Sequence, residues 1–258
     1  MGDSAENTFL PLSWELPARV GATFTTRAGG NSLPPYDSFN IGVHVGDDPA
    51  SVILNRELLQ QKIQIQDIHW LKQVHGSEVV QITGAYRGEI EADASWTDQP
   101  GRALVIQVAD CMPVLVSDKS GSKVGAAHAG WRGLCSGVIH RLLHDMNLVP
   151  KDALVWLGPC IGPSAFEVGP EVFNAFLASP FFLSADVDAA FYPGTGDRLF
   201  ADLQLLARNH LRQFGYESVS CEPHCTVSEP EVFYSYRRDG VTGRHGALIW
   251  INANQASQ

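Results

Sequence analysis

The stretch ALVIQVADCMPVLVSDKSGSKVGAA, residues 103–127, decides the fold class. It contains three short apolar runs rich in β-branched residues, at positions 103–108, 114–117 and 123–127. Small or polar residues separate these runs, and short runs of this composition are typical of β-strands. The stretch therefore predicts adjacent buried strands near the middle of the chain.

Similar patterns extend to both sides of this stretch. Asp48-Pro49 is a helix start, with a carboxylate at the N-cap and proline at the first helical position. Further strands are predicted at residues 20–26, 67–74, 78–82, 154–157, 232–235 and 247–251, and helices at residues 134–146, 171–178 and 197–214. This mixture predicts an α+β (mixed α/β) fold with buried sheets. The absence of repeats and long polar linkers favours a single domain over residues 1–258, with its core at about 20–252.

Composition narrows the classes of function. The 258 residues include 28 acidic and 18 basic side chains, and this excess of acidic groups argues against a general nucleic-acid binder. No apolar run approaches the roughly 20 residues that span a bilayer. The five cysteines are unevenly spaced and the N-terminus lacks a secretory pattern, so a reducing, cytoplasmic location is expected.

Three segments share one design, in which an apolar strand leads into a turn of small residues that carries a reactive side chain. They cover residues 70–76, 108–113 and 125–133, and they present His75, Cys111 and His128. Histidine nitrogen and cysteine thiolate are preferred donors to zinc, and three protein ligands with an open fourth position are typical of a catalytic zinc. The pattern therefore predicts a three-ligand metal centre.

The same residues are compatible with chemistry that needs no metal. Cys111 as a thiolate, activated by His128 or His75, would be a nucleophile of the cysteine-hydrolase kind. Asp110 would then orient a histidine or act as a base. Each of these residues alone could equally be an ordinary core residue at a strand end, since buried cysteine is common. Their three similar contexts together favour a site.

Arginines in the second half of the chain are the other signal. Arg132 follows the third segment, and Arg237, Arg238 and Arg244 lie in a turn-rich stretch that also contains tyrosines. Guanidinium groups suit phosphate or carboxylate, and tyrosine rings can stack on a planar base. The alternative is an exposed loop with solvated arginines. Neither a Walker A loop nor a G-x-G-x-x-G motif occurs, so nucleoside triphosphates and NAD are not indicated.

Taken together, these motifs resemble a known family. The blocks are His75-Gly76, the A-D-C-x-P-V-L block at residues 109–115, H-A-G-W-R-G at 128–133, L-G-P-C-I-G-P at 157–163, and Y-R-R-D with T-G-R at 236–239 and 242–244. They are similar to the laccase-domain family, also called multicopper polyphenol oxidase-like proteins or purine nucleoside phosphorylases. The resemblance runs from about residue 25 to 251.

The resemblance implies a single domain of mixed β-sheets layered between helices, in a four-layer, sandwich-like arrangement. It also implies zinc held by His75, Cys111 and His128, with Asp110 as a further catalytic residue. The residues expected to bind substrate or phosphate are Asn40, Arg56, Arg132, Arg237, Arg238 and Arg244. The implied partners are purine nucleosides and phosphate, without nucleic acid or membrane, for a monomer or small homo-oligomer.

The implied reactions are phosphorolysis of adenosine, inosine, guanosine and methylthioadenosine, and deamination of adenosine. Two alternatives remain open: a cysteine-type amide hydrolase that removes misincorporated L-serine from peptidoglycan precursors, and a non-catalytic zinc or nucleotide-binding module. True multicopper oxidase chemistry is not expected. It requires several His-x-His pairs, and the nine histidines of this chain include none, so zinc is favoured over copper.

Overall fold

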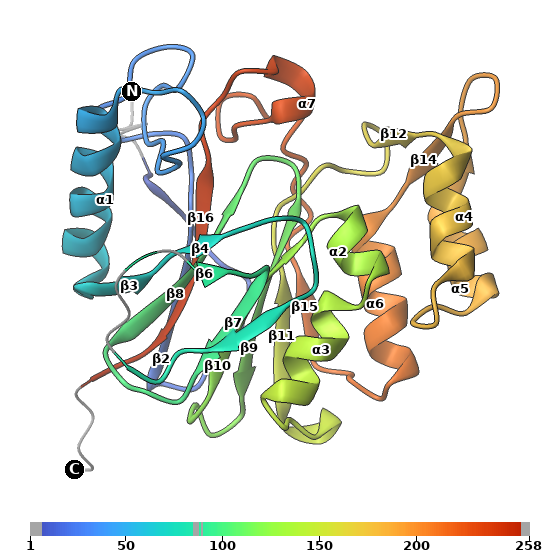
Figure 1. Ribbon diagram of the computed structural model, residues 1–258, viewed down its shortest axis with the longest axis horizontal. Helices are drawn as coiled ribbons and strands as arrows, with labels where there is room; N and C mark the ends of the chain where they lie inside the picture. The colour runs from blue at the N-terminus through green and yellow to red at the C-terminus, as the bar shows by residue number, and fades with distance from the viewer. Residues whose placement is uncertain (1–6, 85–87, 89, 254–258) are drawn as a thin grey trace.

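The computed structural model of the protein describes residues 7–84, 88 and 90–253. Two β-sheets lie face to face at the centre of the molecule, and helices cover their outer faces (Figure 1). Helix α1 (Pro49–Ile63) covers one sheet, and helices α2 (Trp131–Cys135), α3 (Val138–Asp145) and α6 (Leu203–Gln213) cover the other. The predicted mixed α/β fold with layered sheets is confirmed.

The sheet beside α1 has five strands in the order β1-β2-β16-β8-β3. Its strands are β1 (Phe9–Leu10), β2 (Val20–Thr25), β16 (His245–Ile251), β8 (Arg102–Val108) and β3 (Asp67–His69). All neighbours are antiparallel except β3, which is parallel to β8. The C-terminal strand β16 therefore lies in the middle of a sheet that begins near the N-terminus.

The second sheet has six strands in the order β15-β11-β9-β10-β7-β5. They are β15 (Val219–Cys221), β11 (Ala153–Leu157), β9 (Met112–Asp118), β10 (Val124–Ala129), β7 (Ala94–Thr97) and β5 (Val79–Gln81). The central hairpin, β9 with β10, pairs His128 with Pro113 and Ala129 with Met112. The predicted run of strands in the 103–127 stretch is confirmed, but it divides between the sheets, because β8 belongs to the first and the hairpin to the second.

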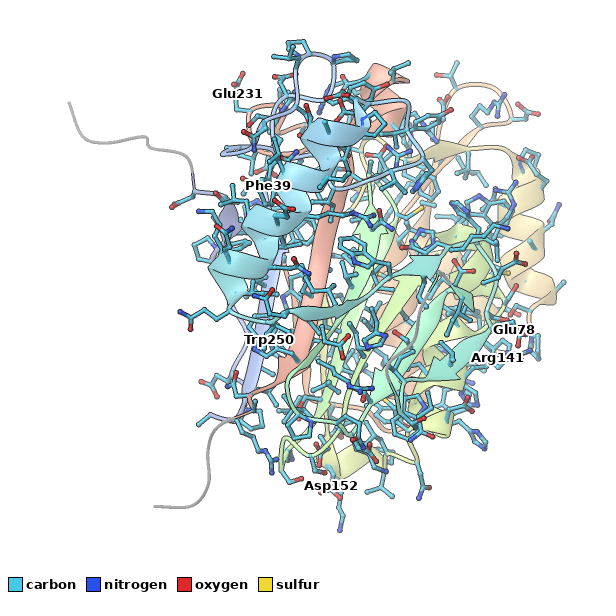
Figure 2. All side chains as sticks on the ribbon, turned by 60° about the vertical axis from the view of Figure 1, so that its left-hand side comes forward. Phe39, Glu78, Arg141, Asp152, Glu231 and Trp250 are labelled. Atoms are coloured by element: carbon cyan, nitrogen blue, oxygen red, sulfur yellow. The ribbon has the colours of Figure 1, made fainter. Side chains whose placement is uncertain are left out.

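Smaller elements complete the fold. Two small sheets join β12 (Glu167–Val168), β14 (Leu199–Ala201) and β13 (Phe191–Pro193), and β4 (Leu71–Lys72) with β6 (Ile90–Glu91). The remaining helices are α4 (Pro170–Ala178), α5 (Ser184–Ala190) and α7 (Tyr236–Asp239), with a 3₁₀ turn at Pro150–Asp152. On the outer face of α3, Arg141 lies 4.0 Å from Glu78, an exposed pair at the molecular surface (Figure 2). Within the described residues, no helix combines the length and apolar character required to cross a bilayer.

Strand alternation divides the core into three apolar layers. In β8, Val105 packs toward α1 while Ile106 packs between the two sheets, and in β16 the same division separates Leu248 from Ile249. A third and larger layer lies between the six-stranded sheet and the helices beyond it. Successive side chains of a strand point to opposite faces. Strands buried on both faces therefore read as continuous apolar runs rather than as alternating patterns.

Several predicted elements are wrong in their boundaries. The helix predicted at residues 134–146 is two helices, because Gly137 between them has φ +80° and packs against the ring of Phe181, where a Cβ would lie 2.5 Å from ring carbons. The helix predicted at 197–214 begins only at Leu203, where Asp202 caps it by accepting a hydrogen bond from the N–H of Leu205 at 2.9 Å. Residues 199–201 form strand β14 instead.

Two predicted strands also differ. Residues 67–74 form β3 and β4, which pair with different sheets, because the chain crosses between sheets after His69. Residues 232–235 join no ladder. The N–H groups of Val232 and Phe233 bond to the carbonyl of Glu229, and the N–H of Tyr234 donates to Nε2 of His245 at 2.7 Å. These groups are satisfied locally and are not available to a sheet.

His245, which accepts the last of these bonds, makes the stability of the fold depend on pH. Burial lowers the pKa of His245 to about 3, and the charges of Arg27 and Arg244 act in the same direction. Below the ordinary histidine pKa of about 6.5, the unfolded chain binds a proton that the folded chain excludes. Stability is therefore lost as the pH falls from about 6.5 toward the folded pKa.

We expect this group alone to lower the free energy of unfolding by about 2 kcal/mol between pH 7 and pH 5. Urea titrations at both pH values, on the wild type and on His245→Asn, measure the difference. The variant is less stable overall, but its stability should depend less on pH by that amount. An equal pH dependence in both proteins would contradict the prediction.

Candidate metal centre

The structure brings together the three predicted ligands. The donor atoms of His75, Cys111 and His128 all lie within 4.8 Å of one another. His75 follows β4, Cys111 lies in the turn between β8 and β9, and His128 is in β10. The two imidazole rings meet edge to face, with centroids 4.7 Å apart. The site therefore lies where the connection between the two central sheets meets the β9–β10 hairpin.

Local backbone geometry places these side chains. His75 has φ +61° and Asp110 has φ +88°, so both turns pass through the left-handed region that non-glycine residues seldom adopt. Such conformations persist when surrounding contacts hold them, and they concentrate at functional sites. At Gly130 a Cβ would lie 2.8 Å from Sγ of Cys111, so the glycine leaves room for the thiol.

A buried carboxylate that the sequence analysis missed holds the site together. Asp93 accepts hydrogen bonds from the N–H groups of His75 at 2.9 Å and Gly76 at 2.7 Å. Its Oδ1 also lies 2.8 Å from Nδ1 of His128. Burial acts to raise the pKa of Asp93, but hydrogen bonds from His128 and Gly76 hold it below its ordinary value. The ionised carboxylate accepts a hydrogen bond from the N–H at Nδ1, which leaves Nε2 of His128 for a metal.

The thiol and the imidazole shift each other's pKa. Burial acts to raise the pKa of Cys111, yet the charges and hydrogen bonds of His128 and His75 lower it to about 6. Burial acts to lower the pKa of His128, and the neighbouring Cys111 thiolate and Asp93 raise it to about 9. The arrangement therefore favours the thiolate form of Cys111, which is the form that ligates metal and attacks carbon.

The residues present fit a zinc ion. Two imidazole nitrogens and one thiolate match the donor set of zinc, and Asp93 supplies the outer hydrogen bond that orients a ligating histidine. A blue-copper site would need a weak axial ligand such as methionine. Met112, adjacent to Cys111, is instead fully buried in the apolar layer beneath α2 and α3.

The three residues lie in an open cavity of about 720 Å³. This volume is in the range that holds small-molecule ligands, roughly 300–1,000 Å³. Aromatic side chains on its wall are Trp131, Phe166 and Tyr236, and cationic ones are Lys72, Arg237 and Arg244. His44, Gln73 and Gln107 also line it. The cavity thus combines planar apolar surfaces with positive charge around the candidate metal centre.

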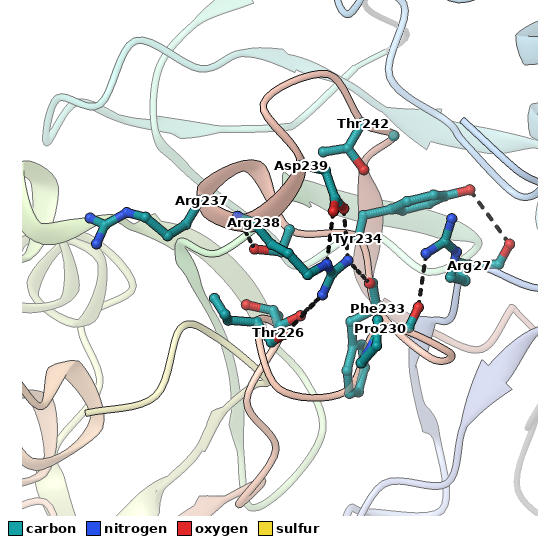
Figure 3. Close-up of polar contacts among 12 residues, drawn as sticks. Arg27, Thr226, Pro230, Phe233, Tyr234, Arg237, Arg238, Asp239 and Thr242 are labelled. Carbon is teal, nitrogen blue, oxygen red and sulfur yellow. Dashed lines mark hydrogen bonds and ion pairs between the residues drawn. The ribbon is translucent and has the colours of Figure 1, made fainter. Parts of the chain in front are cut away.

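The structure separates the arginines that the sequence grouped together. Arg237 and Arg244 line the cavity. Arg238 points the other way, where it bonds to the carbonyl oxygens of Thr226 and Phe233 and to Asp239 (Figure 3). Residues 237 and 238 are neighbours on the single turn of α7, so their side chains leave it in different directions.

The other residues expected to bind substrate are not among the described residues that line the cavity. Arg132 is exposed, with its guanidinium 4.4 Å from the ring of Trp131. Arg56 stacks on Trp70 at 3.5 Å and donates to the carbonyl of Ile41. Asn40 is fully buried and accepts a hydrogen bond from the N–H of Arg244 at 2.8 Å, so it supports the cavity wall from behind.

Asp110 lines the cavity, but both of its carboxylate oxygens have partners. Oδ1 accepts from the hydroxyl of Thr226 at 2.6 Å, and Oδ2 accepts from the N–H of Arg237 at 2.6 Å. The histidine expected to be oriented by Asp110 is oriented by Asp93 instead. This geometry makes Asp110 a positioning residue that ties the Cys111 turn to α7.

Gly130→Ala tests the packing of the centre. Gly130 has φ −61°, which alanine adopts without strain, so the effect is steric only. Displacement of the Cys111 sulfur is expected to weaken zinc binding at least about tenfold, measured by competition with a chelator. Gly84→Ala is the matched control, because a Cβ there meets nothing within 4 Å. Equal zinc affinity in both variants would contradict the prediction.

Comparison with known proteins shows the family and agrees with the fold. The family model described as multi-copper polyphenol oxidoreductase laccase matches residues 21–252. Purine nucleoside phosphorylase YfiH of Escherichia coli is 45% identical over 239 residues, covering 92% of this chain and 96% of that protein. Purine nucleoside phosphorylase PA4543 of Pseudomonas aeruginosa is 45% identical over 246 residues, covering 95% and 99%.

Among solved structures, protein NMB0706 of Neisseria meningitidis superposes with a TM-score of 0.91 at 42% identity, covering 96% of this chain and all of that one. YlmD of Geobacillus stearothermophilus superposes with a TM-score of 0.83 at 29% identity. The family model and these relatives both span nearly the whole length of the chain. The chain therefore belongs to the multi-copper polyphenol oxidoreductase laccase family.

Proposed function

We propose that the protein is a zinc-dependent purine nucleoside phosphorylase, which converts adenosine, inosine, guanosine or methylthioadenosine to the free base and a ribose 1-phosphate. The observation that carries the proposal is the cavity of about 720 Å³ in which His75, Cys111 and His128 face aromatic and cationic walls. The names of relatives that are 45% identical support it. We also propose that the same site deaminates adenosine to inosine.

His75, Cys111 and His128 would hold the metal. When bound, zinc supplies a Lewis acid that polarises a substrate oxygen or lowers the pKa of water. Asp93 keeps the proton of His128 on Nδ1 and fixes the orientation of the ring.

Residues of the cavity wall suit both proposed substrates, the purine nucleoside and phosphate. The faces of Trp131, Phe166 and Tyr236 suit the planar purine. Arg237 is held by hydrogen bonds to the carbonyl oxygens of Ala165 and Glu167 and lies 5.6 Å from the ring of Phe166. A guanidinium fixed in this way is suited to bind phosphate, because little side-chain freedom is lost on binding.

Product analysis tests the proposed reaction. Purified protein is incubated with inosine and with adenosine, each with and without phosphate, and the products are separated by chromatography. We expect free base and ribose 1-phosphate only when phosphate is present, and inosine from adenosine under both conditions. Free base formed equally without phosphate would overturn the phosphorylase assignment. Absence of any turnover would favour the alternatives considered for this site.

Arg237→Ala tests the phosphate site. Loss of a charge-assisted interaction of about 1.5–3 kcal/mol should raise the KM for phosphate at least about tenfold. The KM for the nucleoside should change much less. Arg141→Ala, an exposed arginine on α3 (Figure 2), is the control and should leave both constants unchanged. A rise in the KM for the nucleoside alone would contradict the proposal that Arg237 binds phosphate.

A second candidate function rests on a separate observation. Cys111, His128 and Asp93 form a thiolate, imidazole and carboxylate series, and the pKa of Cys111 is lowered to about 6. This arrangement would also suit a cysteine-type hydrolase that attacks an amide of a peptidoglycan precursor and removes L-serine. Trapping with an electrophilic amide analogue, followed by intact mass, separates the two proposals. A covalent adduct on Cys111 in zinc-loaded protein favours the hydrolase.

The remaining proposals concern the domain organisation, location, oligomeric state and partners of the protein. We propose one catalytic domain over residues 1–258, of which residues 1–6, 85–87, 89 and 254–258 lie outside the described part. All five cysteines are free in the structure, which supports a reducing, cytoplasmic location. We further propose a monomer or small homo-oligomer that binds neither nucleic acid nor membrane.

A further inference from the structure

A second cavity, of about 180 Å³, lies on the other side of Ile161, a residue that lines both cavities. Its wall contains two cysteines, Cys160 and Cys225, that take no part in the metal centre. Cys160 is 3% exposed, whereas Cys225 is partly exposed to the cavity. The cavity therefore gives a small solute access to one thiol, and a second, buried thiol lies beside it.

The backbone holds the two cysteines directly opposite each other. Cys160 and Cys225 form an isolated parallel β-bridge, and the N–H of Thr226 donates to the carbonyl of Cys160 at 3.0 Å. Neighbouring strands lie about 4.8 Å apart, and directly paired residues present their side chains on the same face. A disulfide spans Cα atoms about 4.4–6.8 Å apart. The pair thus meets the backbone requirement for a disulfide without movement of either strand.

The surroundings of Cys225 favour its reactive form. Its sulfur accepts a hydrogen bond from the N–H of Gly162 at 3.2 Å. Burial acts to raise the pKa of Cys225, but hydrogen bonds from Ser228 and Gly162 lower it below the ordinary thiol value. By contrast, burial raises the pKa of Cys135 and Cys221. Of the four cysteines outside the metal centre, Cys225 has the environment that stabilises a thiolate.

We propose that Cys225 is a site of reversible oxidation by hydroperoxides, and that Cys160 is its resolving thiol. This site is separate from the metal centre, and the proposal does not depend on the proposed function. The bridge geometry, the cavity that reaches Cys225 and the N–H donor on its sulfur carry it.

The chemistry balances with one molecule of hydrogen peroxide as the oxidant. The Cys225 thiolate attacks a peroxide oxygen, so that an S–O bond forms, the O–O bond breaks and hydroxide leaves, giving a sulfenic acid. The sulfur of Cys160 then attacks the sulfur of Cys225, an S–S bond forms and the S–O bond breaks. The departing hydroxide takes the thiol proton. Two thiols and one peroxide thus give one disulfide and two waters, and an external dithiol reverses the reaction.

Closure requires a local change only. The Cys225 sulfur leans toward Gly162, where a Cβ would lie 3.1 Å from it. Formation of the disulfide exchanges the Gly162 hydrogen bond for the S–S bond through a rotation of the Cys225 side chain. The product lies behind the Cys111 turn, because the N–H of Ile161 donates to the carbonyl of Asp110 at 2.9 Å.

Peptide mapping of the zinc-loaded, full-length protein tests the proposal. The protein is treated with a small molar excess of hydrogen peroxide, free thiols are blocked with N-ethylmaleimide, and proteolytic fragments are analysed by mass spectrometry. We expect a linked pair of peptides that contain Cys160 and Cys225, lighter by two hydrogen atoms than the separate thiols and released by dithiothreitol. Zinc content is measured in parallel, so that oxidation of Cys111 is recognised.

Two variants complete the test. In Cys160→Ala the reaction should stop at the sulfenic acid of Cys225, which dimedone traps as an adduct. In Cys221→Ala, the matched control, the linked peptides should form as in the wild type. Cys225 left unmodified while other cysteines are oxidised would overturn the proposal, as would a disulfide from Cys225 to Cys221. If Cys160→Ala fails to fold, the linked peptides in the wild type still decide the question.

Discussion

Cys111→Ala and His128→Ala are expected to lose the bound zinc and to slow phosphorolysis of inosine at least about 1,000-fold in kcat/KM. A factor of this size corresponds to about 4 kcal/mol of transition-state stabilisation, which is within what a metal Lewis acid supplies. The donor atoms of both residues belong to the one cluster within 4.8 Å, so neither removal leaves a complete ligand set. Metal analysis and steady-state kinetics on the same preparations measure the two effects.

The controls for this experiment come from the same chain. Cys221→Ala removes a partly buried thiol that is not part of the cluster and should keep both zinc and activity. His75→Ala separates the two proposed roles of Cys111. If Cys111 is a ligand, His75→Ala should lose zinc and activity together. Zinc-free His75→Ala that retained most of its activity would contradict the metal assignment and favour cysteine nucleophilic catalysis.

The candidate metal centre could be predicted from the sequence because its three residues lie in or just after strands with clear signals. Apolar, β-branched runs mark the strands next to Cys111 and His128, and small residues mark the turns. The break between α2 and α3 was not predicted, for the opposite reason. Apolar spacing continues across Gly137, and the ring that packs against this glycine comes from Phe181, far along the chain. Local patterns predict strands and turns, but a contact between distant segments leaves no local signal.

The residues that line the cavity were also hard to predict, because their orientation depends on contacts that leave no local signal. Arg237 and Arg238 are adjacent and chemically identical, yet one lines the cavity and the other binds backbone carbonyls behind it. Only the start of α7, where the Ser235 side chain accepts from the N–H of Arg238, decides which arginine faces the cavity. Asp93 is harder still to find, because nothing in its sequence neighbourhood marks it as a partner of His128. Its A-D-A context resembles A-D-C at Cys111, but that likeness predicts no contact with His128.

Asp93→Asn is therefore expected to have a large effect for a residue that does not itself contact the metal or line the cavity. The carboxylate accepts from the N–H groups of His75 and Gly76 and fixes Nδ1 of His128. An asparagine offers one oxygen in place of two, so its NH₂ group must face a donor. We expect zinc affinity to fall about 10–100-fold, which is typical when the outer partner of a ligating histidine is lost. Competition with a chelator measures this change.

The metal-free protein shows whether Asp93 acts on the metal or on the fold. Loss of hydrogen bonds to a buried charge should lower the free energy of unfolding by about 2–3 kcal/mol, measured by urea titration without zinc. Asp98→Asn, an exposed neighbour, is the control and should change neither quantity. Reduced stability with unchanged zinc affinity would make Asp93 a structural residue of the His75 turn. Reduced zinc affinity in the folded variant, together with reduced kcat/KM of its zinc-loaded form, would make Asp93 the residue that orients His128. Only that role couples the carboxylate to the metal.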